Sequence, residues 1–356
     1  MKIGILSFSI AMGNGQSRFA VNLSRGLKKM GTEVALFAYS CDSSSKVALS
    51  ELGISVYSFK ESLNFSDMYR SVSESRHVYE SVSELIKKSE ICDYYIVLSD
   101  ELIGISAYRT NEKWIYLTQG DMIFLFLNER FLVEHAPFSR IKSTRFVSQL
   151  LKHQRAIRKY DAIIANSRFT AEIMSFFLDS LITEYVYPPV DTEKFKPIHD
   201  SFTNPYALVL LRSNAEPLAQ YVEKFARIVP LRIVGNAFIN GAETLGRVSD
   251  SELIELYSKA TVTVTASLQE FFGYSTAESL ACGTPVISFN HGGAAELIID
   301  GFNGWLVKSD PELINRLKEI FDKGYDEIMR KNSRESTSRF SIEASSKKLV
   351  GLLAKT

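Results

Sequence analysis

Residues 269–286 have the sequence QEFFGYSTAESLACGTPV and follow an apolar, β-branched run, 262–266, that is typical of a buried strand. The loop after this run contains an acid, Glu270, and a glycine, Gly273. The segment 275–281 is predicted to form a helix, because a glycine and a proline follow its end. A helix start exposes unpaired backbone N–H groups, which attract anions and phosphate above all. The stretch therefore predicts a strand, a loop and an anion-binding helix start.

A second acid, Glu278, follows Glu270 with seven residues between them. A carboxylate repels phosphate, so two acids beside a phosphate site suit neutral hydroxyls, as on a sugar or a ribose. The alternative for Glu270 is an acid that only stabilises the helix dipole, which is worth under ~1 kcal/mol. The alternative for Glu278 is a charge on the helix surface. The paired spacing at a helix start favours hydroxyl binding.

This spacing resembles the Glu–x7–Glu signature of the retaining nucleotide-sugar glycosyltransferases with the GT-B fold, the group 1 family that includes glycogen and sucrose synthases. Further segments resemble the same family in order and spacing: PPVDTEKFKP (188–197), LGRVSDSEL (245–253), HGGAAELI (291–298) and DGFNGWLV (300–307). The resemblance covers the C-terminal half of the chain, and the N-terminal half matches more loosely.

The resemblance implies an α/β fold of the GT-B type, with two Rossmann-like domains whose parallel sheets face each other across a cleft. The implied parts are an N-terminal acceptor domain over 1–188, a C-terminal donor domain over 189–338 and a C-terminal helix over 339–356 that crosses back to the first domain. The length of 356 residues independently favours two domains. Two adjacent prolines just before residue 190 predict a hinge.

Alternation of apolar runs with helical patterns predicts a parallel sheet in the first half. The expected strands span 3–7, 34–39, 54–59, 94–99, 114–119 and 162–167, and the expected helices span 17–29 and 67–88. Two helices, over 310–331 and 341–354, are expected to end the chain.

The composition excludes several classes of protein. Apolar residues make up 46% and charged residues 23% of the chain, and 41 basic residues balance 41 acidic ones, so no basic field favours nucleic acid. The three cysteines lack metal-ligand spacing and predict reduced thiols in a cytoplasmic setting. The first residues predict a strand rather than a signal peptide, and no apolar run is long enough to span a membrane.

Two loops of the N-terminal half contain candidate residues. For Gly15 the resemblance implies a backbone contact with the donor diphosphate; the alternative is a glycine that only turns the chain. Gln119 and Asp121 lie where a predicted strand ends, and are expected to bind acceptor or sugar hydroxyls. Many family members have a histidine where Gln119 stands. Glutamine can hydrogen-bond to a hydroxyl but cannot take a proton, so no base is expected there; the alternative is a residue that only caps the loop.

The C-terminal half departs from the family's cation pattern. The usual pattern is glycine and arginine, followed five residues later by lysine, with both cations facing the diphosphate. Arg212 matches the arginine, but Leu211 replaces the glycine and Pro217 the lysine. The charge of the leaving group is then expected to be met by Arg212 and the helix start near Gly273, with a residue from the other domain as a further candidate. Arg247 is expected to stack on the nucleotide base, with a solvent-facing side chain as the alternative.

Glu270 and Arg212 are the predicted catalytic residues. The resemblance implies that Glu270 holds the donor sugar together with backbone N–H groups after it, and that Glu278 binds the ribose. The predicted donor-binding residues are Gly15, Arg247, Phe271, Phe272, Gly273, Tyr274, Ser275 and Glu278. The donor diphosphate is expected to take the acceptor's proton, with retention of configuration. Because the sequence lacks the Asp-x-Asp triplet that binds metal in other glycosyltransferases, neither a metal nor a cofactor is expected.

The predicted function is sugar transfer from a nucleotide sugar to a glycan or lipid-linked acceptor, in the synthesis of cell-surface polysaccharide or glycoconjugate. A predicted helix over 140–159 has a basic face, which can hold a protein peripherally on anionic lipid. The alternative is a core-facing helix with a solvated basic side.

Two other functions stay open. One is a catalytically weak GT-B protein that acts as a binding partner, which Gln119 and Pro217 motivate. The other is a GT-B nucleotide-sugar epimerase, which needs acid and base groups that no residue here obviously supplies.

Overall fold

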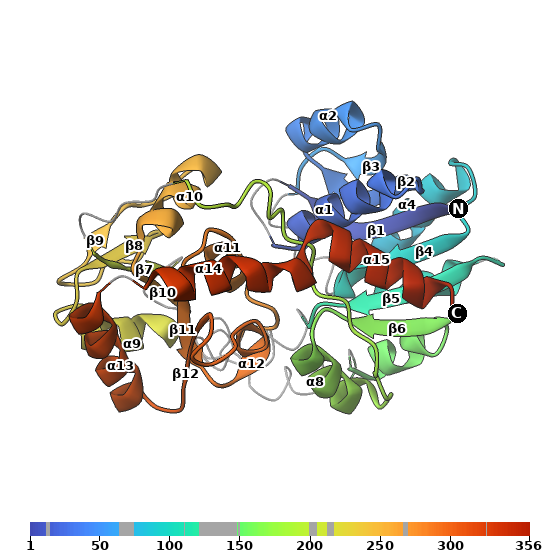
Figure 1. Cartoon of the computed structure of the whole chain (residues 1–356). Helices are drawn as coiled ribbons and strands as arrows, with labels where there is room; N and C mark the ends of the chain where they lie inside the picture. Colours follow the sequence, from blue (N-terminus) through green and yellow to red (C-terminus); the bar gives the residue numbers. More distant parts are fainter. Residues whose placement is uncertain are drawn as a thin grey trace. The chain divides into compact units, whose positions relative to one another are not determined.

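The computed structural model describes residues 1–11, 15–63, 75–109, 111–120, 148, 150–198, 205–211, 217–265, 270–324 and 326–356. The chain divides into two compact units, of which unit 1 is Met1–Pro189 with Ile342–Thr356 and unit 2 is Val190–Ser341. Each unit contains a six-stranded sheet (Figure 1) in which neighbouring strands pair in parallel. The predicted α/β class is therefore confirmed.

The sheet of unit 1 has its first strand near the middle and later strands added on both sides. Its order is β3 (Ser55–Lys60), β2 (Glu33–Cys41), β1 (Lys2–Ile10), β4 (Tyr94–Val97), β5 (Lys113–Thr118) and β6 (Ala162–Ala165). Most residues of β1 and β2 are buried on both faces, which is why these strands have continuous apolar runs instead of alternation. All six strands expected in this half are confirmed, with shifted ends.

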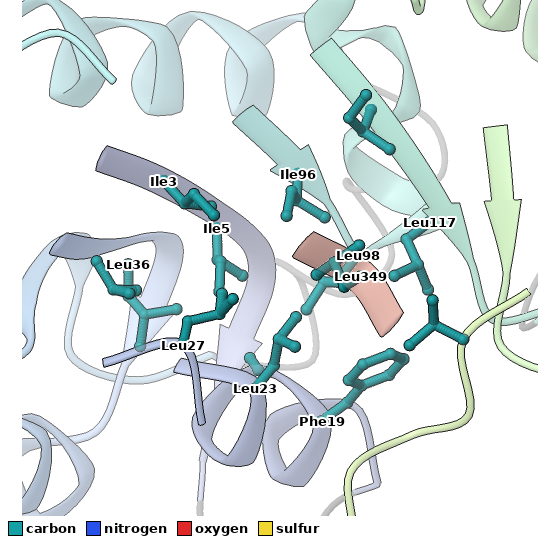
Figure 2. Close-up of a cluster of buried hydrophobic side chains, with 14 of the residues drawn as sticks. Ile3, Ile5, Phe19, Leu23, Leu27, Leu36, Ile96, Leu98, Leu117 and Leu349 are labelled. Carbon is teal, nitrogen blue, oxygen red and sulfur yellow. The ribbon is translucent and has the colours of Figure 1, made fainter. Parts of the chain in front are cut away.

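The helices of unit 1 cover both faces of this sheet. They include α1 (Gly15–Lys29), α2 (Ser43–Glu51), α4 (Ser75–Lys87), the 3-10 helix η1 (Asp100–Tyr108), α8 (Arg168–Leu178), α15 (Ile342–Leu353) and the helical residues 150–157. Figure 2 shows the core on one face, where Phe19 and Leu23 of α1 pack with Ile5 of β1 and Leu349 of α15. The described part of the helix expected over 67–88 is α4, which packs against β2, β3 and η1.

The C-terminal helix α15 belongs to unit 1 because it packs closely against α1. A Cβ added to Gly26 of α1 would lie 2.0 Å from the Ser346 hydroxyl oxygen, so only glycine permits this approach. The Tyr94 hydroxyl of β4 also donates a hydrogen bond of 3.2 Å to the Leu353 carbonyl oxygen. Segments from opposite ends of the sequence therefore share one core.

Unit 2 repeats the architecture with shorter strands. Its sheet order is β12 (Gly304–Val307), β11 (Val286–Phe289), β10 (Val262–Val264), β7 (Ala207–Leu210), β8 (Leu231–Val234) and β9 (Glu243–Thr244). Its helices are α9 (Pro217–Phe225), α10 (Asp250–Lys259), α11 (Tyr274–Ala281), α12 (Gly292–Ala295), α13 (Asp310–Lys323), α14 (Glu327–Ser336) and the 3-10 helix η2 (Thr337–Phe340).

The prediction of a single helix over 310–331 is wrong, because the chain forms the two helices α13 and α14 there. Gly324 ends α13 with φ at 79°, a backbone conformation that side chains rarely adopt. Asp326 then caps α14 by accepting a hydrogen bond of 2.9 Å from the Met329 amide. A continuous pattern of apolar residues concealed these two local signals.

Candidate functional site

The start of α11 is formed by a glycine in the left-handed conformation. Gly273 has φ at 96° and accepts the first intrahelical hydrogen bond, from the Ala277 amide at 3.0 Å. A glycine has no side chain with which to cap the N–H groups of the first turn. The helix start is therefore not blocked by its own N-cap residue, and its dipole favours an anion.

The turn at 291–293 holds the backbone of the preceding loop. The Gly293 amide donates a hydrogen bond of 2.7 Å to the Glu270 carbonyl oxygen. A Cβ added to Gly293 would lie 1.9 Å from the Phe271 carbonyl oxygen, and one on Gly292 would lie 2.9 Å from that of Glu270. This close backbone packing fixes the main chain of Glu270, while the Glu270 side chain stays half-buried.

Buried hydroxyl groups join α11 to the strand before it. The Thr276 hydroxyl donates to the Thr265 hydroxyl at 3.0 Å, and the Ser279 hydroxyl donates to that of Thr263 at 2.7 Å. The Ser288 hydroxyl of β11 reaches the Thr265 carbonyl at 3.1 Å. These short side chains let the helix lie close to the sheet, so the position of the helix start is well determined.

Glu278 lies one turn inside α11 with only 3% of its surface exposed. Burial raises the pKa of the Cys282 thiol to about 12, and the nearby Glu278 carboxylate adds to that rise. This thiol, like those of Cys41 and Cys92, is free and buried. Glu278 is thus buried and is not the surface charge of the alternative interpretation.

Aromatic rings and Arg334 contact the ends of α11, and Arg330 binds the end of the neighbouring helix α10. Phe272 is 3% exposed and packs edge-to-face against Tyr274, with ring centroids 5.3 Å apart. Arg334 of α14 donates to the Ala281 carbonyl at 3.0 Å and to the Thr192 carbonyl at 2.7 Å. Arg330 is buried and donates to the Ala260 carbonyl at 2.8 Å.

Arg247 lies on a different segment of unit 2. The Gly235 amide donates a hydrogen bond of 2.7 Å to the Gly246 carbonyl, and both glycines have positive φ values, 122° and 71°. This pair joins the end of β8 to the segment before α10 and presents Arg247 with an exposed side chain. The ten residues between the two glycines contain no helix.

The predicted residues of unit 1 lie at the carboxyl ends of its strands or at a helix start. Gly15 is the first residue of α1. Gln119 is 7% exposed; its amide nitrogen donates to the Leu98 carbonyl at 2.8 Å, and its own carbonyl accepts from Asn166 at 3.4 Å. Asp121, and Arg212 of the other unit, lie outside the described residues.

The structure therefore brings together Glu270, residues 271–275 and Glu278 on one loop and helix. Such a site can bind a phosphate at the helix start and neutral hydroxyls at the carboxylates. Over the described part of the chain, no group of three or more His, Cys, Asp or Glu side chains is placed to hold a metal ion. Among the same residues, no helix combines the length and apolar character that crossing a bilayer requires.

Two acids at the carboxyl end of β4 were not predicted from the sequence. Asp100 and Glu101 begin η1 directly after that strand. The signal was present, since two adjacent acids followed a predicted strand, but it matched no motif. The sequence also did not predict that Asn166, after β6, would lie at the same edge as Gln119.

Two α/β units, each with a parallel sheet, together with these site elements define the class as a GT-B protein. Comparison with solved structures agrees. Sucrose-phosphate synthase from Thermosynechococcus elongatus matches with a TM-score of 0.78 at 17% identity, over 99% of this chain and 98% of that one. HepE from Anabaena in complex with UDP and glucose matches with a TM-score of 0.72 at 19% identity, over 100% of both chains. The predicted fold class is confirmed.

A match to a protein family lies within the sequence of unit 2. Residues 237–337 match the family described as "Glycosyl transferases group 1", so the resemblance to that family is confirmed for this segment. Among curated proteins, the GDP-Man:Man(3)GlcNAc(2)-PP-Dol alpha-1,2-mannosyltransferase of Mus musculus is 26% identical over 224 residues, 51% of this chain and 46% of that protein. The chain spans less than half the length of the curated relatives it matches.

Proposed function

We propose that this protein is a glycosyltransferase that moves a hexosyl group from a nucleotide sugar to a hydroxyl of a glycan or lipid-linked acceptor. One observation carries the proposal: Glu270, with its main chain fixed by Gly293, stands beside a helix start whose N-cap is glycine, and Glu278 lies enclosed one turn further. The matched family and the relatives named above support it.

The proposed reaction breaks the bond between the anomeric carbon and the diphosphate, and forms a bond from the same face to the acceptor oxygen. The departing diphosphate takes the acceptor's proton, so configuration is retained and no side chain acts as base. Backbone amides at the α11 start and Arg212 would stabilise the charge that develops on the diphosphate. Glu270 would bind the donor sugar hydroxyls, Glu278 the ribose, and Gly15 would approach the diphosphate with its backbone.

In other glycosyltransferases a metal ion stabilises the negative charge on the leaving group. Here the helix dipole and Arg212 would provide this stabilisation, so we propose a metal-independent reaction. The donor would be a nucleoside diphosphate sugar: HepE binds UDP, and the mouse relative is named for GDP-mannose. Synthesis of cell-surface polysaccharide or glycoconjugate on the cytoplasmic side is the setting that fits a lipid-linked acceptor.

We propose that the predicted helix 140–159 makes a peripheral contact with anionic lipid, and a basic cavity in unit 1 supports this. A cavity of about 220 Å³ lies between η1 and the helical residues 150–157, and Lys152, Arg155 and Lys159 line it. None of the described residues that line it is acidic. On the same helix, the apolar side chain of Leu151 is 45% exposed. Cations beside an exposed apolar side chain fit an anionic membrane surface.

A catalytically weak protein that binds nucleotide sugars is the second candidate, and the environment of Gln119 favours it. The Gln119 amide nitrogen is bound to the Leu98 carbonyl, so it holds the edge of the sheet. Pro217 begins α9 where the family has a lysine. Tight nucleotide binding without transfer and without donor hydrolysis would favour this candidate over the transferase.

Glu270→Gln tests the transferase directly. We expect it to lower the rate of sugar transfer by at least a hundredfold while the melting temperature stays within a few degrees, since the side chain is half-buried and not part of the core. The matched control is Glu319→Gln, an exposed residue on α13, which should retain wild-type rates. Full activity of Glu270→Gln would overturn the assignment.

A further inference from the structure

Among the described residues at the carboxyl-terminal edge of the unit 1 sheet, two buried acceptor oxygens have no hydrogen-bond donor. They are Oε2 of Glu101, just after β4, and Oδ1 of Asn166, just after β6. A buried polar atom left unpaired costs about 1–3 kcal/mol, and folded proteins satisfy nearly all such atoms. Two at one edge of a sheet are available to hydrogen-bond donors of a bound molecule.

The local backbone explains why Glu101 is left open. The Phe8 amide donates to the Ser99 hydroxyl at 2.7 Å, which ties the start of η1 to β1. The buried Tyr116 hydroxyl donates to the Asp100 carboxylate, so Asp100 turns toward β5. The Glu101 carboxyl group instead accepts hydrogen bonds from its own backbone amide and from the side chain of Gln16 in the first turn of α1. Its Oε2 has no hydrogen-bond partner among the described residues, and the residue as a whole stays partly exposed.

Asn166 is left open by a similar arrangement. Its amide nitrogen donates to the Gln119 carbonyl, and the Gln119 amide nitrogen donates to the Leu98 carbonyl. The ends of β4, β5 and β6 are therefore linked by side-chain donors, and these donors are consumed within the edge. Acceptor oxygens remain, so the edge is complementary to a ligand that donates hydrogen bonds.

We propose that Glu101, with Asn166 as a second contact, accepts hydrogen bonds from hydroxyl groups of the acceptor substrate, and that this edge selects a neutral polyhydroxylated acceptor. The proposal rests on the transferase function above, for which it names the acceptor class. A hydroxyl group donates a hydrogen bond to a carboxylate, whereas a phosphate group has no donor to offer and is repelled by the negative charge.

Equilibrium binding tests this with glucose as the neutral probe. The melting temperature is followed in saturating UDP across a glucose series at pH 9, where the Glu101 carboxyl is ionised, for the wild type, Glu101→Gln and the control Glu84→Gln. Glu84 is an exposed glutamate on α4 of the same unit. Loss of a hydrogen bond to a charged group should raise the half-saturating glucose concentration about tenfold or more in Glu101→Gln. The control should match the wild type.

Glucose 1-phosphate provides the second arm. The wild type should bind it less tightly than glucose, and Glu101→Gln should narrow that difference because it removes the repelling charge. Equal half-saturating glucose concentrations for the wild type and Glu101→Gln would overturn the proposal. A rise in melting temperature with glucose that is no larger in the wild type than in Glu101→Gln would also overturn it. These measurements follow binding and not turnover, so their outcome is separate from the loss of transfer expected for Glu270→Gln.

Discussion

The backbone amide of Gly293 is bonded to the carbonyl oxygen of Glu270 at 2.7 Å, so a turn after one strand fixes the catalytic candidate that follows another. The two residues are far apart in sequence but belong to loops at the carboxyl ends of the adjacent strands β10 and β11. Glycine is required at position 293, because a Cβ there would lie 1.9 Å from the Phe271 carbonyl oxygen.

Gly293→Ala should therefore displace the Glu270 loop. We expect a loss of stability of about 2 kcal/mol from overpacking against backbone, and a fall in transfer rate of at least a hundredfold from misplacement of the carboxylate. Chemical denaturation and initial rates measure the two effects. Gly351→Ala is the control, since a Cβ on Gly351 of α15 meets nothing within 4 Å. Wild-type rates in Gly293→Ala would show that the turn does not position Glu270.

Glu278→Gln should weaken nucleotide binding more than it slows transfer at saturating donor. The Glu278 carboxylate lies on α11, is buried, and is proposed to accept hydrogen bonds from the ribose. A neutral amide accepts such bonds less strongly. We expect about a tenfold rise in the dissociation constant of UDP by calorimetry, with Glu319→Gln unchanged. An unaltered dissociation constant would remove Glu278 from the proposed donor site.

Stability should depend on pH through Glu101. Burial, reinforced by the Asp100 carboxylate, raises the pKa of the Glu101 carboxyl from 4.5 to about 7. Because the folded-state pKa exceeds the unfolded one, the stabilisation from protonated Glu101 is complete below pH 4.5 and is lost as the pH rises through 7. Glu101→Gln does not lose this stabilisation. Its free energy of unfolding relative to the wild type should therefore rise by about 3 kcal/mol between acidic and mildly alkaline pH.

Denaturant titrations of the wild type, Glu101→Gln and Glu84→Gln across that range measure the difference. Comparison between variants removes the contribution of other titrating groups. A stability difference between Glu101→Gln and the wild type that does not change with pH would contradict the raised pKa.

Charge reversal should abolish the proposed lipid contact. The triple change Lys152→Glu, Arg155→Glu and Lys159→Glu inverts the basic lining of the unit 1 cavity. Sedimentation with phosphatidylglycerol vesicles should recover the wild type at low salt and not the variant, since each cation near an anionic surface is worth about 1 kcal/mol. Neither protein should sediment with phosphatidylcholine vesicles. Equal recovery of both proteins on phosphatidylglycerol would exclude this helix as the contact.

Strong local patterns allowed much of the fold to be predicted. Apolar runs such as 3–7 and 34–39 became buried parallel strands, and the helix expected over 275–281 formed as α11. The break between α13 and α14 was missed, because the positive φ of Gly324 interrupts a sequence that is apolar at helical spacing on both sides. Local signals identify an element well, but one glycine can divide it.

The sequence by itself determined the class of fold and one side of the candidate site, because Glu270, Gly273 and Glu278 lie on one loop and helix, where spacing alone sets their geometry. Only the tertiary structure decided which groups from distant segments support or extend that geometry. Gly293 reaches Glu270, and Glu101 and Asn166 share an edge, because parallel strands bring together loops that are far apart in the chain. Hydrogen bonding across such an edge depends on strand order, which residue spacing does not encode.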